Sequence, residues 1–140
     1  MIEVPRYIRN HEAVVSAFGY WPSFHDAPIL AFKRTTDRIT LALHAWEMTS
    51  QVDASGYFVR QKHHIVRFTF CGITQVDLAQ FIPENILFAL LFSPSSVFEA
   101  TGQFTVDLDS AMGGDLCGSF AATSGEVMAV LPCDPRAQLL

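Results

Sequence analysis

Apolar and polar residues alternate along most of this chain with the period of two that is typical of half-buried strands. The alternation is clearest in residues 38–46 and 103–109, where every second side chain is apolar. Residues 85–93 are apolar on both faces, which indicates a central strand of a covered sheet. Strands are predicted at residues 29–34, 38–46, within 57–73, and at 85–93, 103–109, 116–122 and 127–131.

One segment has convincing helical periodicity. Within residues 5–18, apolar side chains and His11 recur at helical spacing, with Asn10 as a candidate N-cap and Gly19 as the C-terminal stop. This helix is expected to cover one face of a sheet. A single helical turn is also predicted at residues 76–81, before a proline.

Turn-forming residues separate the predicted strands. A short turn at residues 35–37 joins the first two strands, and residues 48–56 form a polar connection. The Ser-Gly pair at 124–125 is typical of a hairpin between the last two strands. Pro132 ends the last strand, and residues 134–140 are expected to fray.

The short turn at residues 35–37 suggests a register for the hairpin that it joins. If Arg34 faces Ile39, the same offset places Phe32 opposite Leu41. The pairs that follow outward are Leu30 with Leu43, Ile29 with His44, Ala27 with Trp46, and Asp26 with Glu47. This register would bring two carboxylates together at the strand ends.

These elements predict an α+β fold. Residues 1–140 are expected to form a single domain, a mostly antiparallel and curled β-sheet of six to seven strands with the N-terminal helix packed on it. A strongly curled sheet or a partial barrel is the nearest alternative. A length of 140 residues suits one domain with a full core.

The segment Gly19–Ile29, called the elbow below, joins the predicted helix to the first strand. It contains several aromatic residues, an adjacent His25-Asp26 pair and two prolines. Pro22 and Pro28 fix their own φ angles and push the residues before them towards extended geometry. A rigid elbow of this kind serves either packing or recognition.

Composition narrows the classes of function. Half of the residues are hydrophobic, yet no apolar run approaches the roughly 20 residues that cross a bilayer. Without a recognisable secretory signal, a cytoplasmic protein is expected. Cys71, Cys117 and Cys133 form no CxxC pair and are expected to be reduced. A net charge of −5 argues against a nucleic-acid partner and suits a basic protein partner.

Several residues could carry chemistry. His25 and Asp26 could form an acid–base pair, although adjacent strand residues point to opposite faces. His25 and His44, with His63 or His64, could ligate zinc, but no metal-binding spacing supports such a site. Asp26 and Glu47 could form the two-carboxylate arrangement of a glycosidase or an acidic patch. No nucleotide-binding or nucleophile motif is present, and no cofactor is expected.

The elbow also carries a family resemblance. Its stretch Trp-Pro-Ser-Phe-His-Asp-Ala at residues 21–27, together with His-Ala-Trp-Glu at 44–47, resembles the immunity protein 50 family of bacterial polymorphic-toxin systems. The resemblance implies a non-enzymatic protein that binds and neutralises a cognate toxin, which an acidic surface would suit if the toxin were basic, such as a nuclease. A monomer or a homodimer is expected.

Aromatic residues near carboxylates form the predicted recognition surface, because Trp and Tyr often dominate protein interfaces. The partner-binding residues predicted on this basis are Trp21, Phe24, His25, Asp26, Trp46, Glu47 and Asp53. The alternatives are a small metal-dependent hydrolase built on His25, Asp26, His44 and Glu47, and a small-ligand-binding module with the elbow as a pocket wall.

Overall fold

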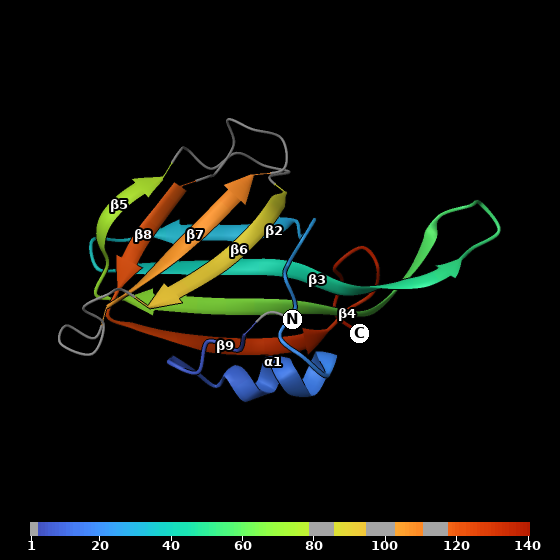
Figure 1. Ribbon diagram of the computed structural model, residues 1–140, viewed down its shortest axis with the longest axis horizontal. Helices are drawn as coiled ribbons and strands as arrows, with labels where there is room; N and C mark the ends of the chain where they lie inside the picture. Colours follow the sequence, from blue (N-terminus) through green and yellow to red (C-terminus); the bar gives the residue numbers. More distant parts are fainter. Residues whose placement is uncertain (1–2, 79–85, 95–102, 111–117) are drawn as a thin grey trace.

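Two β-sheets lie face to face in the computed structural model, with one helix beside them (Figure 1). The structure describes residues 3–78, 86–94, 103–110 and 118–140. Within these ranges the elements are β1 (Ile8–Arg9), α1 (His11–Phe18), β2 (Ile29–Arg34), β3 (Arg38–Val52), β4 (Phe58–Cys71), β5 (Thr74–Leu78), β6 (Leu87–Pro94), β7 (Phe104–Ser110), β8 (Gly118–Ala122) and β9 (Ser124–Pro132).

The larger sheet has the strand order β1-β9-β4-β3-β2, and the smaller has the order β5-β8-β7-β6. All pairs are antiparallel except β1 with β9. The α+β character holds in the coarse sense that the described residues are mostly β with one short helix. However, the described part has nine strands in two sheets, where six to seven in one sheet were predicted.

The chain crosses between the sheets at Thr123, the one residue that separates β8 from β9. The prediction of a hairpin at 124–125 is therefore wrong, because β8 pairs with β5 and β7 while β9 pairs with β4 and β1. Alternation cannot reveal such a crossing, since both strands keep one apolar face towards the shared core.

Aromatic side chains from both sheets fill the space between them. On β4, Phe68 and Phe70 are fully buried; the Phe70 ring lies 6.3 Å from that of Phe104 and 5.4 Å from that of Phe120. Phe68 similarly lies 5.9 Å from Phe92 of β6. Burying each such side chain is worth about 1.5–3 kcal/mol, so these contacts hold the two sheets together.

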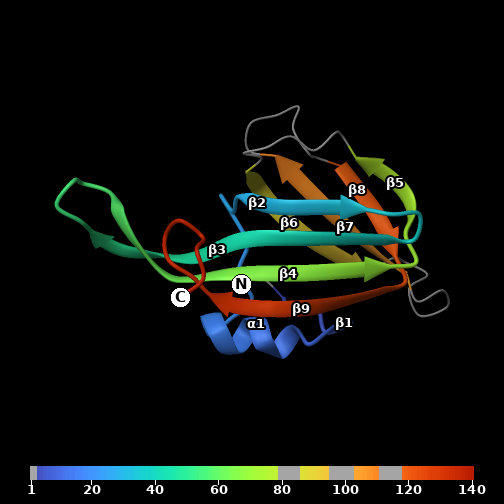
Figure 2. The same ribbon diagram turned by 180° about the vertical axis from the view of Figure 1, so that it is seen from behind.

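The helix packs against β9 and β4, along one side of the larger sheet (Figures 1 and 2). It begins at His11, directly after the predicted N-cap Asn10. However, Asn10 is left-handed and its side chain does not cap the helix; its Nδ2 instead donates 2.9 Å to the carbonyl of Val127. Gly19 ends it as predicted, with φ 86° and a hydrogen bond to the Val15 carbonyl. In the described ranges, no helix has the length and apolar character needed to span a membrane.

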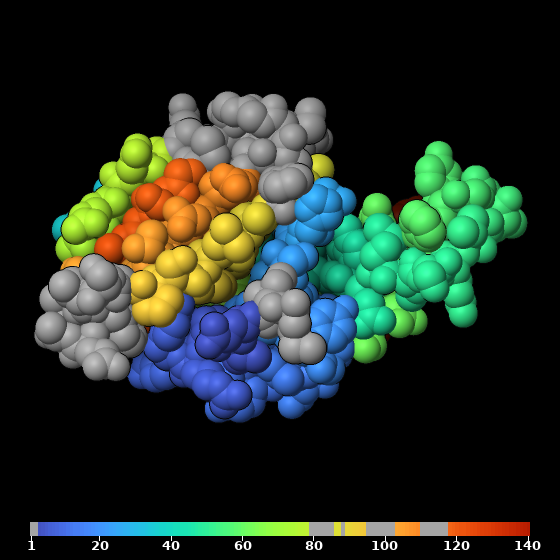
Figure 3. All heavy atoms as spheres, in the orientation of Figure 1, coloured from blue at the N-terminus to red at the C-terminus, as the bar shows by residue number. Residues whose placement is uncertain are grey.

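Residues 48–60 form a hairpin arm that projects beyond the sheets (Figures 1 and 3). β2 pairs with β3 only as far as Leu43, and β9 pairs with β4 only as far as His64, so the arm's two strands pair only with each other. The polar connection predicted at 48–56 is instead mostly strand, since β3 runs to Val52. Cross-strand pairing overrides the weak local preference of these polar residues.

Three further predictions are corrected. Residues 76–78 belong to β5 instead of a helical turn, and 79–81 lie outside the described residues. The central strand predicted at 85–93 is β6, which is an edge of the smaller sheet with Leu91 48% exposed. The tail at 134–140 is folded into a turn, in which Asp134 Oδ1 accepts hydrogen bonds from the backbone N–H groups of Arg136 and Gln138.

The register of the first hairpin is confirmed at its turn, where Arg34 faces Ile39. A bulge between residues 29 and 31 then places Ile29 opposite Leu43 instead of His44. Strand pairing ends at this point, so the pairs predicted further outward do not form. The expected facing of Asp26 and Glu47 across the hairpin is therefore wrong.

Replacing Gly125 by Ala is predicted to destabilise the fold by about 1–3 kcal/mol, because overpacking a core costs this much. A Cβ at this position would lie 2.7 Å from Ile8 Cδ1, 3.0 Å from Phe70 Cδ1 and 3.1 Å from Phe104 Cζ. Denaturant unfolding measures the loss. The control is Ser124→Ala on the same strand, expected within about 0.5 kcal/mol of the unaltered protein; equal losses would contradict the packing described here.

Candidate functional site

Two left-handed residues shape the elbow. Phe24 has φ 58° and Asp26 has φ 64°, conformations that non-glycine residues seldom adopt and that are costly for a bulky side chain. Backbone hydrogen bonds hold them: Asp26 N–H donates 2.9 Å to the Leu87 carbonyl, and Leu87 N–H donates 2.9 Å to the Ala27 carbonyl. The elbow is thus tied to β6 of the smaller sheet while it leads into β2 of the larger one.

Strained backbone of this kind often accompanies function, but here it also serves packing. Trp21 and Phe24 are each only 3% exposed and contact one another edge to face at 5.8 Å. Both rings also contact Phe68 of the core. Both residues are therefore buried, but Phe24 lines the cavity described below, whereas Trp21 does not.

His25 and Asp26 project outward from the same turn. Their side chains are 53% and 47% exposed, and His25 Nε2 lies 3.4 Å from Asp26 Oδ2. The expectation that the two side chains point to opposite faces is wrong, because these residues are not in a strand and Asp26 is left-handed. The turn therefore presents an imidazole and a carboxylate together to solvent.

A cavity of about 280 Å³, called the elbow cavity, lies between the elbow and residues 46–48 of β3. It is lined by Tyr20, Pro22, Ser23, Phe24, His25, Asp26, Trp46, Glu47 and Met48. Five of the seven predicted partner-binding residues thus meet at one surface. Asp53 does not line it, since it lies in the turn at the tip of the hairpin arm.

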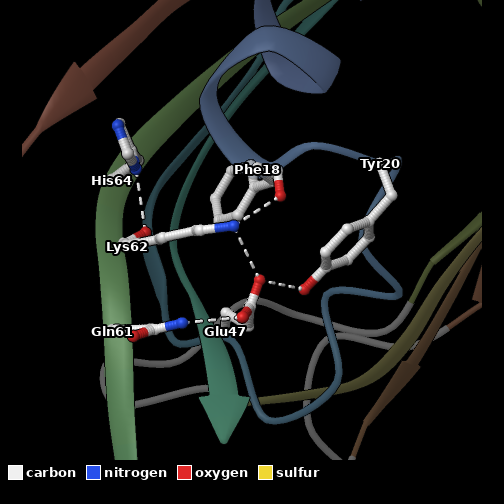
Figure 4. Close-up of polar contacts among 6 residues, drawn as sticks. All are labelled: Phe18, Tyr20, Glu47, Gln61, Lys62 and His64. Carbon is white, nitrogen blue, oxygen red and sulfur yellow. Dashed lines mark hydrogen bonds and ion pairs between the residues drawn. The ribbon is translucent and has the colours of Figure 1, made fainter.

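Glu47 anchors one wall of this cavity (Figure 4). Its Oε2 accepts a 2.9 Å hydrogen bond from Tyr20 Oη and lies 3.0 Å from Lys62 Nζ, while Gln61 Nε2 donates 2.8 Å to Oε1. Hydrogen bonds from Lys62, Gln61 and Tyr20 lower the pKa of Glu47. Burial, with the Glu47 hydrogen bond and charge adding to it, raises the pKa of Tyr20 to about 12. Glu47 is therefore an ionised acceptor that positions its neighbours.

Lys62 connects this network to the helix. Its Nζ also donates 2.9 Å to the carbonyl of Phe18 at the end of α1, and its own φ is 57° within a bulge of β4 (Figure 4). The helix end, the elbow and the base of the arm are thereby held together. Sequence reasoning missed Lys62 and Gln61, because no local pattern gives the register of β4 against β3, which places Gln61 opposite Glu47 with Lys62 next to it.

His44 lies apart from the elbow cavity. It is 5% exposed, and its Nε2 is 2.9 Å from Nδ1 of His63, so one ring donates and the other accepts. The Trp46 ring lies 5.0 Å from the His44 ring, and the Arg60 guanidinium lies 4.5 Å over Trp46. Within the described ranges, no group of three or more His, Cys, Asp or Glu side chains is placed to hold a metal ion.

Burial, followed by nearby positive charge, lowers the pKa of both His44 and His63; Asp134 opposes this. The imidazoles of His44 and His63 are therefore protonated less readily in the folded protein than in the unfolded chain. The resulting contribution to stability is fully present above the ordinary histidine pKa of about 6.5, and it is lost as the pH falls through the lowered values of the folded state.

The free energy of unfolding is therefore predicted to decrease as the pH falls from 7.5 to 5.5. The decrease is expected to be less steep in His63→Gln, because this variant has one fewer histidine with a lowered pKa. Denaturant unfolding across this range measures the two slopes. A slope that the substitution leaves unchanged would count against the histidine pair as its source.

The comparisons with known proteins identified no relative of this chain. No family model matches the chain, and neither a curated protein nor a solved structure does. What the elbow cavity does is therefore inferred from the chain's own residues.

Proposed function

We propose that this protein is a non-enzymatic immunity protein that binds a cognate bacterial toxin through the rim of the elbow cavity. The carrying observation is that a strained, hydrogen-bonded turn presents His25 and Asp26 to solvent beside Trp46 and Glu47. These are the residues on which the resemblance to the immunity protein 50 family rests. Residues held in strained backbone conformations cluster at functional sites.

The rim combines groups suited to a protein partner. Tyr20 is 41% and Met48 47% exposed, and aromatic and methionine side chains are enriched at interfaces. Asp26 supplies a carboxylate at the edge, whereas both oxygens of Glu47 already accept hydrogen bonds within the protein. Asp26 is therefore the acidic group offered to a basic residue of the toxin, and Glu47 keeps the wall in place.

The network behind the rim supports rigid recognition. Glu47 joins Tyr20 of the elbow to Lys62 and Gln61 of β4, so the wall is fixed before a partner arrives. A preformed surface loses less conformational entropy on binding than a flexible one. With a net charge of −5, the protein would also attract a basic toxin over a longer range.

The purified protein is predicted to form a 1:1 complex with the toxin domain encoded beside its gene, and to protect cells that express this domain. Isothermal titration calorimetry and a growth assay measure the two effects. Growth arrest despite co-expression, together with no heat of binding, would refute the proposal.

Asp26→Asn is predicted to weaken toxin binding by about tenfold or more, because a hydrogen bond to a charged group is worth about 1.5–3 kcal/mol. Asn tolerates the left-handed φ of this position, so the turn is kept. The matched control, Glu12→Gln, removes the same charge from the exposed side of α1, where the side chain is 72% exposed. Equal weakening by both variants would mean that only overall charge matters and that the rim is not the interface.

A further inference from the structure

A second and larger cavity lies at the hairpin arm, away from the elbow turn. Its volume is about 570 Å³, and it is called the arm cleft. It is lined by Met48, Asp53, Tyr57, Phe58, Val59, Arg60, His63 and Pro135, so the arm forms most of it and the C-terminal turn contributes one residue. Only Met48 also lines the elbow cavity. The volume is within the range of about 300–1,000 Å³ that is usual for small-molecule sites.

The walls of the arm cleft are apolar and exposed. Tyr57 is 72%, Phe58 56% and Met48 47% exposed, although side chains of this kind are normally buried. Among the described residues, the two strands of the arm pair only with each other, so the arm extends beyond the rest of the larger sheet. Exposed apolar side chains gathered around a cavity are typical of a binding surface.

Positive charge lies at the base of the arm. Arg60 faces Met48 across the hairpin, and its guanidinium is held 4.5 Å over the Trp46 ring. Within the described part of the chain it forms no ion pair with a carboxylate. His63 lines the same cleft with its Nδ1 bound to His44, so its Nε2 is the ring nitrogen left to meet a ligand.

Two carboxylates also lie in or beside the cleft: Asp53 lines it, and Asp134 is close enough to His63 to oppose the lowering of its pKa. Asp53 is in the tip turn, where its Oδ1 already accepts hydrogen bonds from the N–H groups of Ser55 and Tyr57. Asp134, in the C-terminal turn, has its Oδ1 engaged in the same way by the N–H groups of Arg136 and Gln138. Arg60 thus supplies positive charge at the base of the arm, apolar side chains form the walls, and each nearby carboxylate has one oxygen engaged in its own turn.

We propose that the arm cleft binds a small organic anion with a flat apolar body. Its acid group would meet Arg60 and His63, and its body would lie against Tyr57, Phe58 and Met48. Arginine suits this role because its planar guanidinium can donate two hydrogen bonds to one carboxylate, and the stacking on Trp46 orients it before a ligand arrives. Among the described residues, this site shares only Met48 with the lining of the elbow cavity.

The test uses 2-naphthoate as the probe and 2-naphthamide as its neutral counterpart, titrated into the full chain and followed by calorimetry and by shifts of backbone amide NMR signals. Naphthoate is predicted to bind at least about tenfold more tightly than naphthamide, in keeping with a charge-assisted contact. The shifts are expected at residues 57–63 and around Pro135. Equal binding of the two probes, shifts confined to other residues, or no binding would overturn the proposal.

Arg60→Gln is predicted to weaken naphthoate binding about tenfold and to leave naphthamide unchanged, while Arg60→Lys loses less because it keeps the charge. The matched control is Arg67→Gln, which removes an exposed arginine from the same strand outside the cleft. Thermal unfolding checks the fold of each variant, and Asp26→Asn is expected to bind naphthoate normally. Equal losses in Arg60→Gln and Arg67→Gln would refute the proposed contact.

Discussion

Burial of aromatic side chains between the two sheets is the constraint on which the rest of the structure depends. Neither sheet could expose Phe68, Phe70, Phe104 and Phe120 to water without a large cost, so the sheets must face one another. The elbow follows from the same constraint. Trp21 and Phe24 reach into this core from a short segment, and the backbone must turn sharply to place them there.

That turn links packing to the proposed function. Phe24 is directed into the core. Because Phe24 and Asp26 both have left-handed φ angles, the chain turns so that His25 and Asp26 lie side by side in solvent. The Glu47 network then fixes the opposite wall of the elbow cavity through Tyr20, Gln61 and Lys62 (Figure 4). The burial of Phe24 on one side of the elbow thus produces an ordered polar surface on the other side.

Local pattern was enough for much of the fold. The strict alternation in β3 and β7, the turn at 35–37 and the helix stop at Gly19 all follow from short-range rules of side-chain direction and φ preference. The structure also brings Phe24, His25, Asp26, Trp46 and Glu47 to one cavity, although Trp21 and Asp53 do not line it. The elbow's role in packing and the extent of the arm do not follow from such rules.

The amino-acid sequence by itself therefore determined where the helix and most of the strands form, because those choices depend on neighbours along the chain; the exceptions are β1, β5 and the part of β3 that enters the arm. The tertiary structure alone decided that the chain leaves the larger sheet between Cys71 and Thr74 and returns to it at Thr123. It also decided that Lys62 reaches Glu47, and that Trp21 is buried while His25 is exposed. These outcomes depend on contacts between residues far apart in sequence, and an apolar face shows only that it must be covered, without showing by what.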